Sequence, residues 1–599
     1  MLPALRVSLF FAAVLITSTG SGQPSAPSEK KEPPKLDLRP NYTAFPDLKP
    51  HAPTKKDDIL LPMLPELPID APLLRKVQRE QAREGFTYLG RITSVIRDER
   101  WNQQYLHDTL FMMSAVYRVA AELEDKLANR IPWYEERVRK LKELEVFIET
   151  RVQNGTAPPF HLLLVRFTRL SAEADLLRLQ AEVAKTGIRS ELTITMKKSD
   201  VVFDPKKTPP SYTAFPDLKP PTYEKKTTKN SDGMIVVVEE EKGVVPLPGL
   251  PILPKDEPSL QTVHHKQVLE GLVYQKRLAG PRILVCFTDR TGLLYSTIAG
   301  VADTYQTAAS LEERLGDRIA WYESRVRELK RVERFIEARV TLGTTPPHDL
   351  DMLRFYRLQT EADLLRLKDE VEKAGPTTAP APQREEFTFE EPKDRHKSLQ
   401  PHYTAFPDLK PSTIEWSKVK DDQGITRQVR RETNIVPRPP LPAVGADDPH
   451  LRKVLFEQLQ TGLDYLNHLS EIRERGEWNA AYFREYAHIA MDVYRVAAKL
   501  ETTQAKRVAW YEARIRTLKN IERYIDIRVG LGTSPPEMLN NIRVERLRAE
   551  AELLSLKAEP EPVTLKTEAP LVIVYPPGCF YPPPCERPRA RLLPRLFRR

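Results

Sequence analysis

The chain has 599 residues, of which 40% are hydrophobic and 29% are charged, a composition that leaves room for several small domains. Its 54 prolines against 23 glycines predict that much of the chain is stiff, extended connector. The formal net charge is +9, but residues 586–599 hold six Arg and one Glu and alone supply +5. The rest is close to neutral, which argues against a basic groove, so we expect no nucleic-acid partner.

Residues 1–22 are typical of a secretory signal, because Arg6 precedes the apolar run VSLFFAAVLI and small residues follow it. An uncleaved membrane anchor is the alternative. The run has only about ten apolar residues, which is short for a membrane span. We therefore expect an exported protein, either secreted or periplasmic within the cell envelope.

The nine residues YTAFPDLKP occur three times, at 42–50, 212–220 and 403–411. Tyr, Phe and Leu set between prolines favour polyproline geometry and docking on a groove. One interpretation is a strap that covers the open side of its own helical bundle; the other is a motif that binds a partner. The candidate partner-binding residues are Tyr42, Phe45, Leu48, Tyr212, Phe215, Leu218, Tyr403, Phe406 and Leu409.

A helical region is predicted after each of these segments. Residues 73–98 and 450–476 resemble each other and predict a leading helix, whereas Gly280 and Pro281 interrupt the second copy, where RILVCF with Cys286 favours a strand. A helix from about Gln103 to Lys126 follows, and we expect it to run into the next helix with a kink at Pro132 in the first copy only.

A helical hairpin is then written three times, starting at Trp133, Trp321 and Trp510, and a Gly lies 22 residues after each Trp. Apolar residues on its first helix step by three or four, and a short connection makes the second helix antiparallel. Thr345 and Ser534 precede prolines and are predicted N-caps of the second helix. Surface pairs with Glu four residues before Arg are expected at Glu135 and Arg139, Glu323 and Arg327, and Glu512 and Arg516.

One hairpin is too small to fold alone. Its apolar side chains supply on the order of 15–30 kcal/mol on burial, whereas ordering about fifty residues costs on the order of 75 kcal/mol. The upstream helices must pack on the hairpin, or the copies must pair with each other or with other chains. The fold class predicted is mainly α, with three tandem antiparallel helical-bundle repeats joined by long Pro-rich linkers that carry small β-hairpins.

The predicted β-hairpins follow the second and third YTAFPDLKP segments and turn at 231–233 and 422–424. In the tail, Cys579 and Cys585 bracket FYPPP; they are a candidate disulfide unless the prolines hold the thiols apart. The expected segments are a signal peptide (1–22), a Pro-rich leader (23–70), helical repeats (71–186, 258–374, 448–558), linkers (187–257, 375–447) and a Pro/Arg-rich tail (559–599).

The sequence contains no recognised catalytic, cofactor-binding or metal-binding motif, so we predict no enzyme, no cofactor and no metal site. Glu485 and His488 have the ExxH spacing of di-iron bundles, but the first copy lacks it. His264 and His265 adjoin and are interpreted as a solvated pair. Arg and Glu spaced by four on the second hairpin helix fit a salt-bridged outer face or a partner-binding stripe: Arg169 and Glu173, Arg357 and Glu361, Arg546 and Glu550. The three Trp are expected to anchor the helix junctions.

The turn and second helix, GTAPPFHLLLVRFTRLSAEADLLRL and its counterparts, resemble the hairpin turn and return helix of the TolC-like outer-membrane efflux family. They are also similar to hairpin repeats in uncharacterised secreted bacterial proteins. The chain departs from the efflux family in its Pro-rich connectors and in having no ten-residue alternating barrel strands. The resemblance implies a coiled-coil-like hairpin in the envelope and does not imply export activity.

The leading functional hypothesis is a non-catalytic exported repeat protein that acts as a scaffold or multivalent protein-binding module in the cell envelope, through a protein partner or self-association. The alternatives are an efflux-associated hairpin component or an envelope anchor, whose Arg-rich tail holds anionic lipid or a cell-wall polymer. An enzyme with an unrecognised site is a further alternative.

Overall fold

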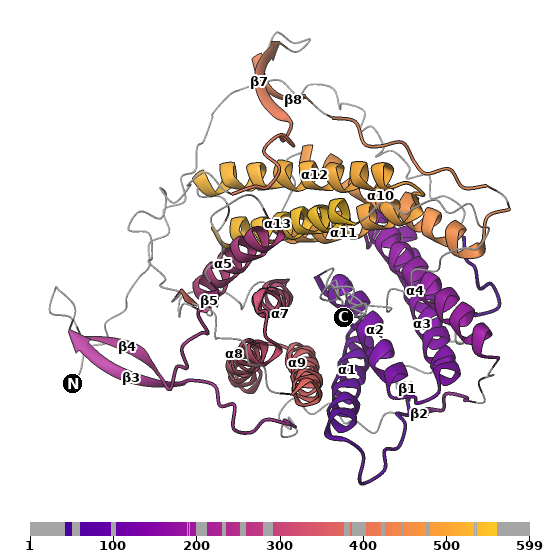
Figure 1. Cartoon of the computed structure of the whole chain (residues 1–599). Coiled ribbons are helices and arrows are strands. Elements are labelled where there is room, and N and C mark those ends of the chain that lie inside the picture. Colours follow the sequence, from indigo (N-terminus) through magenta and orange to yellow (C-terminus); the bar gives the residue numbers. More distant parts are fainter. Residues whose placement is uncertain are drawn as a thin grey trace, which may run out of the picture. The chain divides into compact units, whose positions relative to one another are not determined.

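The fold is taken from a computed structural model of the chain (Figure 1). It describes residues 42–50, 60–97, 104–187, 190, 192–198, 212–229, 235–251, 259–279, 292–375, 384–385, 403–420, 426–434, 436–445, 447–474, 480–531, 534 and 536–559. Contacts divide the chain into Met1–Asn41 and Tyr42–Arg599, and every described residue belongs to the second unit. The signal segment, the Gly280–Pro281 interruption, Cys286, Cys579, Cys585 and the Arg-rich tail lie outside the described residues.

The described chain is mainly helical, as the sequence predicts. Among its residues, no helix is both long and apolar enough to cross a bilayer. The helices of the first copy are α1 (Leu73–Arg97), α2 (Gln104–Glu122), the 3₁₀ turn η1 (Leu127–Arg130), α3 (Ile131–Gln153) and α4 (Pro159–Thr186). Those of the second are α5 (Leu260–Ala279), α7 (Gly292–Leu311), α8 (Leu315–Thr341) and α9 (Pro347–Ala374). Those of the third are α10 (His450–Glu474), α11 (Ala480–Leu500), α12 (Gln504–Gly530) and α13 (Pro536–Ala558).

The hairpins α3–α4, α8–α9 and α12–α13 pack along their lengths. In the first, Gly155 ends the helix in the left-handed region at φ +69°, where a residue without Cβ is favoured. Its N–H donates to Val152 O at 3.0 Å, and Thr156 N–H donates to Arg151 O at 2.8 Å. These are the two bonds of a Schellman motif. Gly343 closes α8 in the same way, whereas Gly532 lies outside the described residues.

The second helix of the second hairpin, α9, starts one residue later than predicted. Thr345 is not the N-cap of α9; Pro346 is, at φ −70° and ψ 144°, and Pro347 is the first helical residue. A residue that precedes proline is pushed into the extended region, so the first proline of the pair cannot be helical. The Thr345 hydroxyl instead accepts from Arg339 Nε at 2.9 Å. In the third copy the described part of α13 begins at Pro536, and Pro535, the expected first helical residue, lies outside the described residues.

The prediction that the helix after each leading helix continues into the first helix of the hairpin, which carries the Trp, is wrong. In every copy the chain breaks before that helix: α2 ends at Glu122, α7 at Leu311 and α11 at Leu500. Pro132 lies in the first turn of α3. Proline is well tolerated there, because the N–H it lacks has no helical partner at that position, so Pro132 starts a helix and kinks none.

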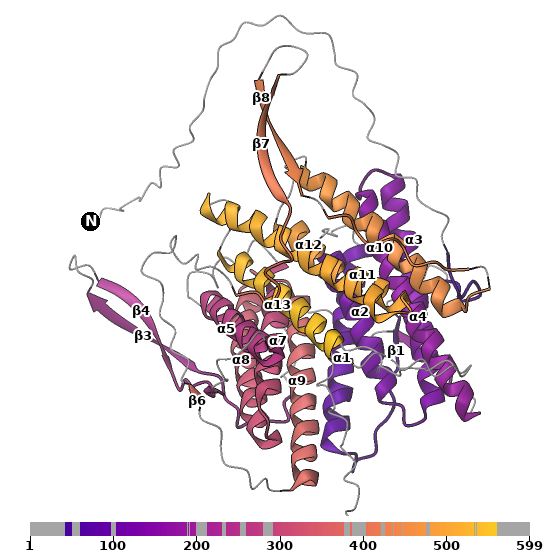
Figure 2. The ribbon, with the colours of Figure 1, turned by 45° about the horizontal axis from the view of Figure 1, so that its top comes forward.

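The strands form two-stranded antiparallel sheets outside the helices (Figure 2). The hairpin β3 (Thr222–Lys229) with β4 (Ile235–Lys242) and the hairpin β7 (Thr413–Lys420) with β8 (Thr426–Thr433) enclose the turns predicted from the sequence. Two short pairs were not predicted: β1 (Leu60–Pro62) with β2 (Met196–Lys198), and β5 (Leu250–Pro251) with β6 (Arg384–Glu385). Each short pair joins the segment before one copy's leading helix to the segment after the same copy's last helix.

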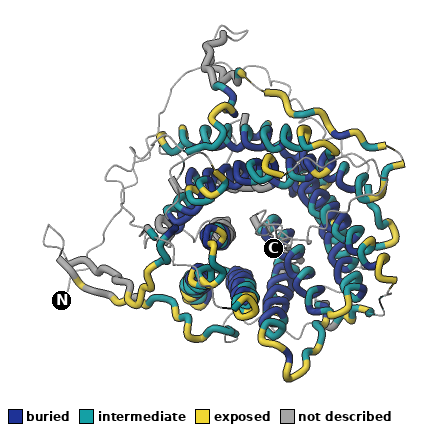
Figure 3. Tube along the Cα trace, viewed as in Figure 1, coloured by how far each residue is buried: buried dark blue, intermediate teal, exposed yellow. Residues whose placement is uncertain are grey.

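The leading helices α1, α5 and α10 do not pack mainly on their own hairpins. Instead α1 packs on α9, α5 on α13, and α10 on α4. At the first of these contacts Val77 lies in one buried cluster with Leu358 and Ala362. Figure 3 shows the buried stretches concentrated within the helices and the exposed residues at turns and connectors. Every hairpin therefore completes its core with a helix from another sequence copy, one of the alternatives that the energy argument leaves open.

Two glycines mark where the leading helices come closest to their neighbours. A Cβ on Gly85 of α1 would lie 2.3 Å from Val116 Cγ2 and 2.9 Å from Phe355 Cδ2 of α9. A Cβ on Gly462 of α10 would lie 2.9 Å from Phe167 Cδ2 of α4. The phenylalanine of the return helix thus packs against bare backbone, a contact that only glycine permits without a shift.

Candidate functional site

The YTAFPDLKP segments, here called straps, lie on the hairpin of their own copy. In the first copy the Thr43 hydroxyl donates to Glu173 Oε1 at 2.6 Å and Ala44 N–H donates to Glu173 Oε2 at 2.8 Å. Arg169 Nη2 donates to Tyr42 O at 2.8 Å, and Lys142 Nζ donates to Phe45 O at 2.5 Å. Four successive residues of the strap are therefore held by charged side chains, three of them through the backbone and Thr43 through its hydroxyl.

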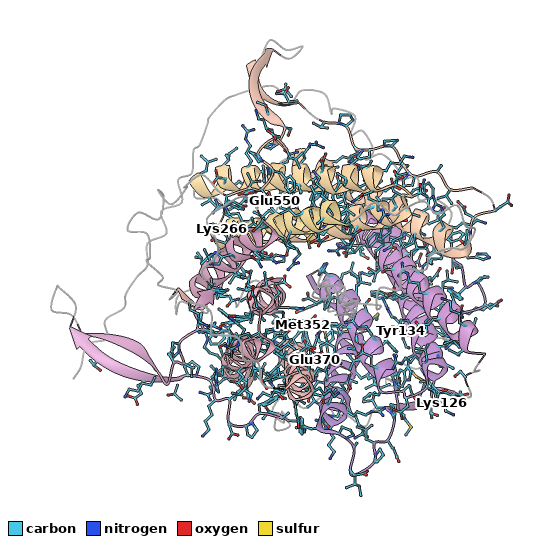
Figure 4. The ribbon with its side chains drawn as sticks, viewed as in Figure 1. Lys126, Tyr134, Lys266, Met352, Glu370 and Glu550 are labelled. Carbon is cyan, nitrogen blue, oxygen red and sulfur yellow. The ribbon has the colours of Figure 1, made fainter. Side chains whose placement is uncertain are left out.

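The same four bonds recur in the other two copies. Glu361 accepts from Thr213 and Ala214, each at 2.7 Å, and Glu550 accepts from Thr404 at 2.6 Å and Ala405 at 2.9 Å. Figure 4 labels Glu550 on α13. The strap carbonyls accept from Arg357, Lys330, Arg546 and Lys519. Burial lowers the pKa of all three lysines that bind the straps, Lys142, Lys330 and Lys519.

Each strap rests on a buried network of ion pairs. In the first copy Glu145 accepts from Arg166 Nε at 2.8 Å and from Arg169 Nε at 2.7 Å, and Arg169 Nη1 donates to Glu173 at 2.6 Å. The side chains of Arg169 and Glu173 are 1% and 0% exposed. We call these residues, together with the lysine, the strap-binding cluster: Lys142, Glu145, Arg166, Arg169 and Glu173, with counterparts Lys330, Glu333, Arg354, Arg357 and Glu361, and Lys519, Glu522, Arg543, Arg546 and Glu550.

Arg169 and Glu173, and their counterparts, form ion pairs as predicted, but the prediction that they lie on an outer face is wrong. Spacing by four shows that two side chains share a helix face, but it does not show whether that face meets solvent. Here the face lies under the strap and against the preceding helix. The Glu and Lys partners on that preceding helix were missed, although the repeat of Lys three residues before Glu in all copies was a usable signal: Lys142 and Glu145, Lys330 and Glu333, Lys519 and Glu522.

The nine candidate partner-binding residues lie half-buried in the straps, except Leu409, which is buried. Within the first strap Leu48 N–H donates to Phe45 O at 3.2 Å and closes a turn with Pro46 at its second position. Pro46, Asp47 and Lys49 are exposed. The structure thus holds Tyr42 and Phe45 on the hairpin through their carbonyl groups and leaves Pro46 and Asp47 of the turn exposed.

The three Trp side chains have the same surroundings. They are at most 1% exposed, and each indole N–H donates to a Glu nine residues earlier: Trp133 to Glu124 at 3.1 Å, Trp321 to Glu312 at 2.9 Å, and Trp510 to Glu501 at 3.2 Å. That Glu lies in the break before the helix, so the bond joins the two helices as predicted.

Buried ionisable groups gather where α1 meets the start of α9. Burial raises the pKa of Asp349 well above its usual value and that of Asp351 to about 7. Burial also lowers the pKa of His348 to about 4. Arg91 of α1 lies with Nε 3.1 Å from Asp351 Oδ2. These groups lie at the packing contact between copies one and two.

No group of three His, Cys, Asp or Glu side chains suited to a metal ion occurs among the described residues. The side chains of Glu485 and His488 lie outside them. His264 and His265, interpreted as a solvated pair, are both half-buried, and burial lowers the pKa of His264 to about 4.

Comparison with known proteins gives no match. Neither a protein-family profile, nor a curated protein, nor a solved structure is significantly similar to the chain.

Proposed function

We propose that this chain is a non-catalytic exported repeat protein that acts as a scaffold or multivalent protein-binding module in the cell envelope. It would be built from three helical modules (71–186, 258–374 and 448–558) on Pro-rich linkers, of which two carry a small β-hairpin. The resemblance to TolC-like hairpins adds the expectation of an envelope location; no export activity is proposed.

One observation carries the proposal. The three Trp and the residues of the strap-binding clusters, which are identical in all three copies, are occupied by folding contacts: each Trp bonds a Glu, and each strap-binding cluster bonds its strap. A catalytic site inherited by duplication would require reactive groups in an accessible pocket. These groups are buried or half-buried and are engaged with other groups of the same chain, which is the arrangement expected when repetition serves architecture.

The binding surface is proposed to be the outer side of the straps. Each strap is identical in sequence and is held in the same way, so each offers an exposed Pro-Asp turn and a following Lys on a rigid base, such as Pro46, Asp47 and Lys49. Three equal surfaces on one chain raise the apparent affinity for a partner that can reach more than one of them. A protein partner is favoured, because the surface is small, mixed in charge and repeated.

The test compares the unmodified full-length protein with Asp47→Arg, Asp217→Arg and Asp408→Arg variants, singly and together. A partner captured by cross-linking in the native envelope is titrated against each variant by surface plasmon resonance. Single changes should weaken binding by less than the triple change, which should weaken it by about tenfold or more because avidity is lost. Asp369→Arg, at an exposed site on α9 outside the strap sequence, is the matched control. Unchanged affinity in the triple variant would reject the straps as the binding surface.

A further inference from the structure

The three contacts made by the leading helices follow one cyclic order. The leading helix of copy one, α1, packs on copy two. In the same way α5 of copy two packs on copy three, and α10 of copy three packs on copy one. Each leading helix is used once and each return helix (α4, α9 or α13) receives one. The order therefore closes within a single chain, with no return helix left for an outside partner.

A shared apolar seam does not explain this order. The leading helices have the same residues along the seam, since Val77, Gln81, Gly85 and Tyr88 recur as Val263, Gln267, Gly271 and Tyr274 and as Val454, Gln458, Gly462 and Tyr465. The return helices likewise share the Leu and Ala that meet this seam, as in Leu358 with Ala362 and Leu547 with Ala551. Any leading helix would satisfy the apolar part of any return helix.

One position near the start of each return helix, three residues before the first arginine of the strap-binding cluster, differs between the copies. In α9 the position is Asp351, which pairs with Arg91 of α1 at 3.1 Å; the side chains are 3% and 11% exposed. In α13 it is Asn540, whose Nδ2 donates to Glu270 of α5 at 2.7 Å. In α4 it is Leu163, which is buried.

The start of each return helix is contacted by the leading helix that packs on it. The α10 helix, which packs on α4, has His468 where α1 has Arg91, and the imidazole lies 5.2 Å from the Phe160 ring, centroid to centroid. Copy two also contacts α13 through a buried ion pair, between Asp303 of α7 and Arg548. At the position of Asp303 copy one has Ala115, whereas copy three has another aspartate, Asp492, so this pair distinguishes copy two from copy one only.

A wrong pairing would leave buried polar groups unmatched. If α1 packed on its own return helix, Arg91 would face Leu163; if α10 packed on α9, Asp351 would lose its guanidinium partner. A buried charge without a partner is costly, so such mismatches select against the wrong helix more strongly than matches select for the right one.

We propose that the residue at the position of Leu163, Asp351 and Asn540, with its partner on the incoming helix, selects which copy's leading helix each return helix accepts. The interaction surface is thus the groove of each hairpin, and its partner is the leading helix of one particular other copy in the same chain. The apolar seams of the three copies are alike. The residues at this position and their partners therefore determine the cyclic order of the helices.

Disulfide trapping in the full-length chain tests the order directly. In a background with Cys286→Ser, Cys579→Ser and Cys585→Ser, Leu74→Cys of α1 is combined with Leu365→Cys of α9, a pair that flanks one buried cluster. The two control pairs place the second cysteine at the matching position of the other return helices, Leu177→Cys or Leu554→Cys. Only the first pair should cross-link efficiently, and the product should run as a monomer. A dominant product with Leu177→Cys or Leu554→Cys, or a cross-link between chains, would overturn the cyclic order.

Exchanging the selecting residues tests the mechanism. With Leu163→Asp and Asp351→Leu together, α1 should leave α9 for α4, so the 74–365 cross-link should fall and the 74–177 cross-link should rise, by about tenfold in ratio. Leu451→Cys with Leu365→Cys should then report α10 on α9. The matched control exchanges the exposed tip residues, Asn154→Leu with Leu342→Asn, and should leave the ratio unchanged.

A milder variant guards against loss of folding. Arg91→His installs the residue type that α10 carries at this position, and it should lower the 74–365 yield relative to the 74–177 yield while helicity by circular dichroism is retained. A ratio that stays constant in this variant, or in a folded exchange variant, would show that chain connectivity alone sets the order and would overturn the proposal.

Discussion

We predict that Glu361 of the strap-binding cluster is essential for holding the second strap on its hairpin. Its side chain is fully buried, and it accepts from Arg357, from the Thr213 hydroxyl and from Ala214 N–H. Glu361→Ala would leave the Arg357 guanidinium buried with one carboxylate fewer and two strap donors without an acceptor. Removing one partner of a buried ion pair costs about 3–5 kcal/mol. The strap should be released before the helices unfold, because these contacts are what hold it.

The matched control is Glu323→Ala on the same hairpin. Glu323 lies 3.5 Å from Arg327 and 3.1 Å from Lys368, but its side chain is 25% exposed. Ion pairs in contact with solvent contribute about 0–1 kcal/mol. The two variants each remove one glutamate, but the loss of stabilising free energy should be several-fold larger for Glu361→Ala because Glu361 is buried.

Amide hydrogen exchange of the strap is the assay. Leu218 N–H, which donates to Phe215 O at 3.2 Å, reports strap opening without itself bonding to Glu361. A change of 3 kcal/mol corresponds to about a hundredfold, since each ~1.4 kcal/mol is tenfold. Leu218 should thus exchange about a hundred times faster in Glu361→Ala and nearly unchanged in Glu323→Ala. Similar rates in the two variants would refute the view that the buried network holds the strap.

Two further predictions concern the contact between α1 and α9. Gly85→Ala should destabilise by about 1–3 kcal/mol in urea unfolding, because the new Cβ would meet Val116 and Phe355 within 3 Å; Gly316→Ala, where no atom lies within 4 Å, should be neutral or slightly stabilising, and equal effects would contradict the close approach. Burial raises the pKa of Asp351 from 3.8 to about 7, so the folded state binds this proton more tightly, and the resulting stability is complete below about pH 4 and is lost as the pH rises through 7. Asp351→Asn should remove this loss, so that its stability relative to the unmodified protein improves by on the order of 4 kcal/mol between pH 4 and 8; a difference that does not vary with pH would refute the assignment.

The local structure could be predicted because it depends on near neighbours in the chain. Apolar spacing of three and four predicts the helices, and glycine after the last apolar residue predicts the stop that Gly155 makes at φ +69°. The surface pairs from Glu to Arg also occur, at 3.8 Å for Glu135 and Arg139. The prediction failed at the start of α9. There Pro347 keeps the residue before it, Pro346, extended, and this effect outweighs the preference of Thr345 for the N-cap position.

The tertiary contacts could not be predicted in the same way. Periodicity identifies an apolar face but not the element that will cover it, and three nearly identical seams offer three equal choices for each leading helix. The pairing between Arg91 and Asp351 joins residues far apart in the sequence, with one member in each of two copies. Nothing in either segment alone distinguishes such a residue from a solvated charge.

The sequence by itself determined that the chain is mainly helical, where its hairpins turn, and which residues are repeated three times, because these properties depend on the order of residues within a few turns. Only the tertiary structure decided that Arg169 and Glu173 are buried beneath a strap, and that each leading helix packs on another copy. The physical reason is that burial belongs to a pair of surfaces: a charged side chain is exposed or buried according to what packs over it, and that partner lies more than a hundred residues away.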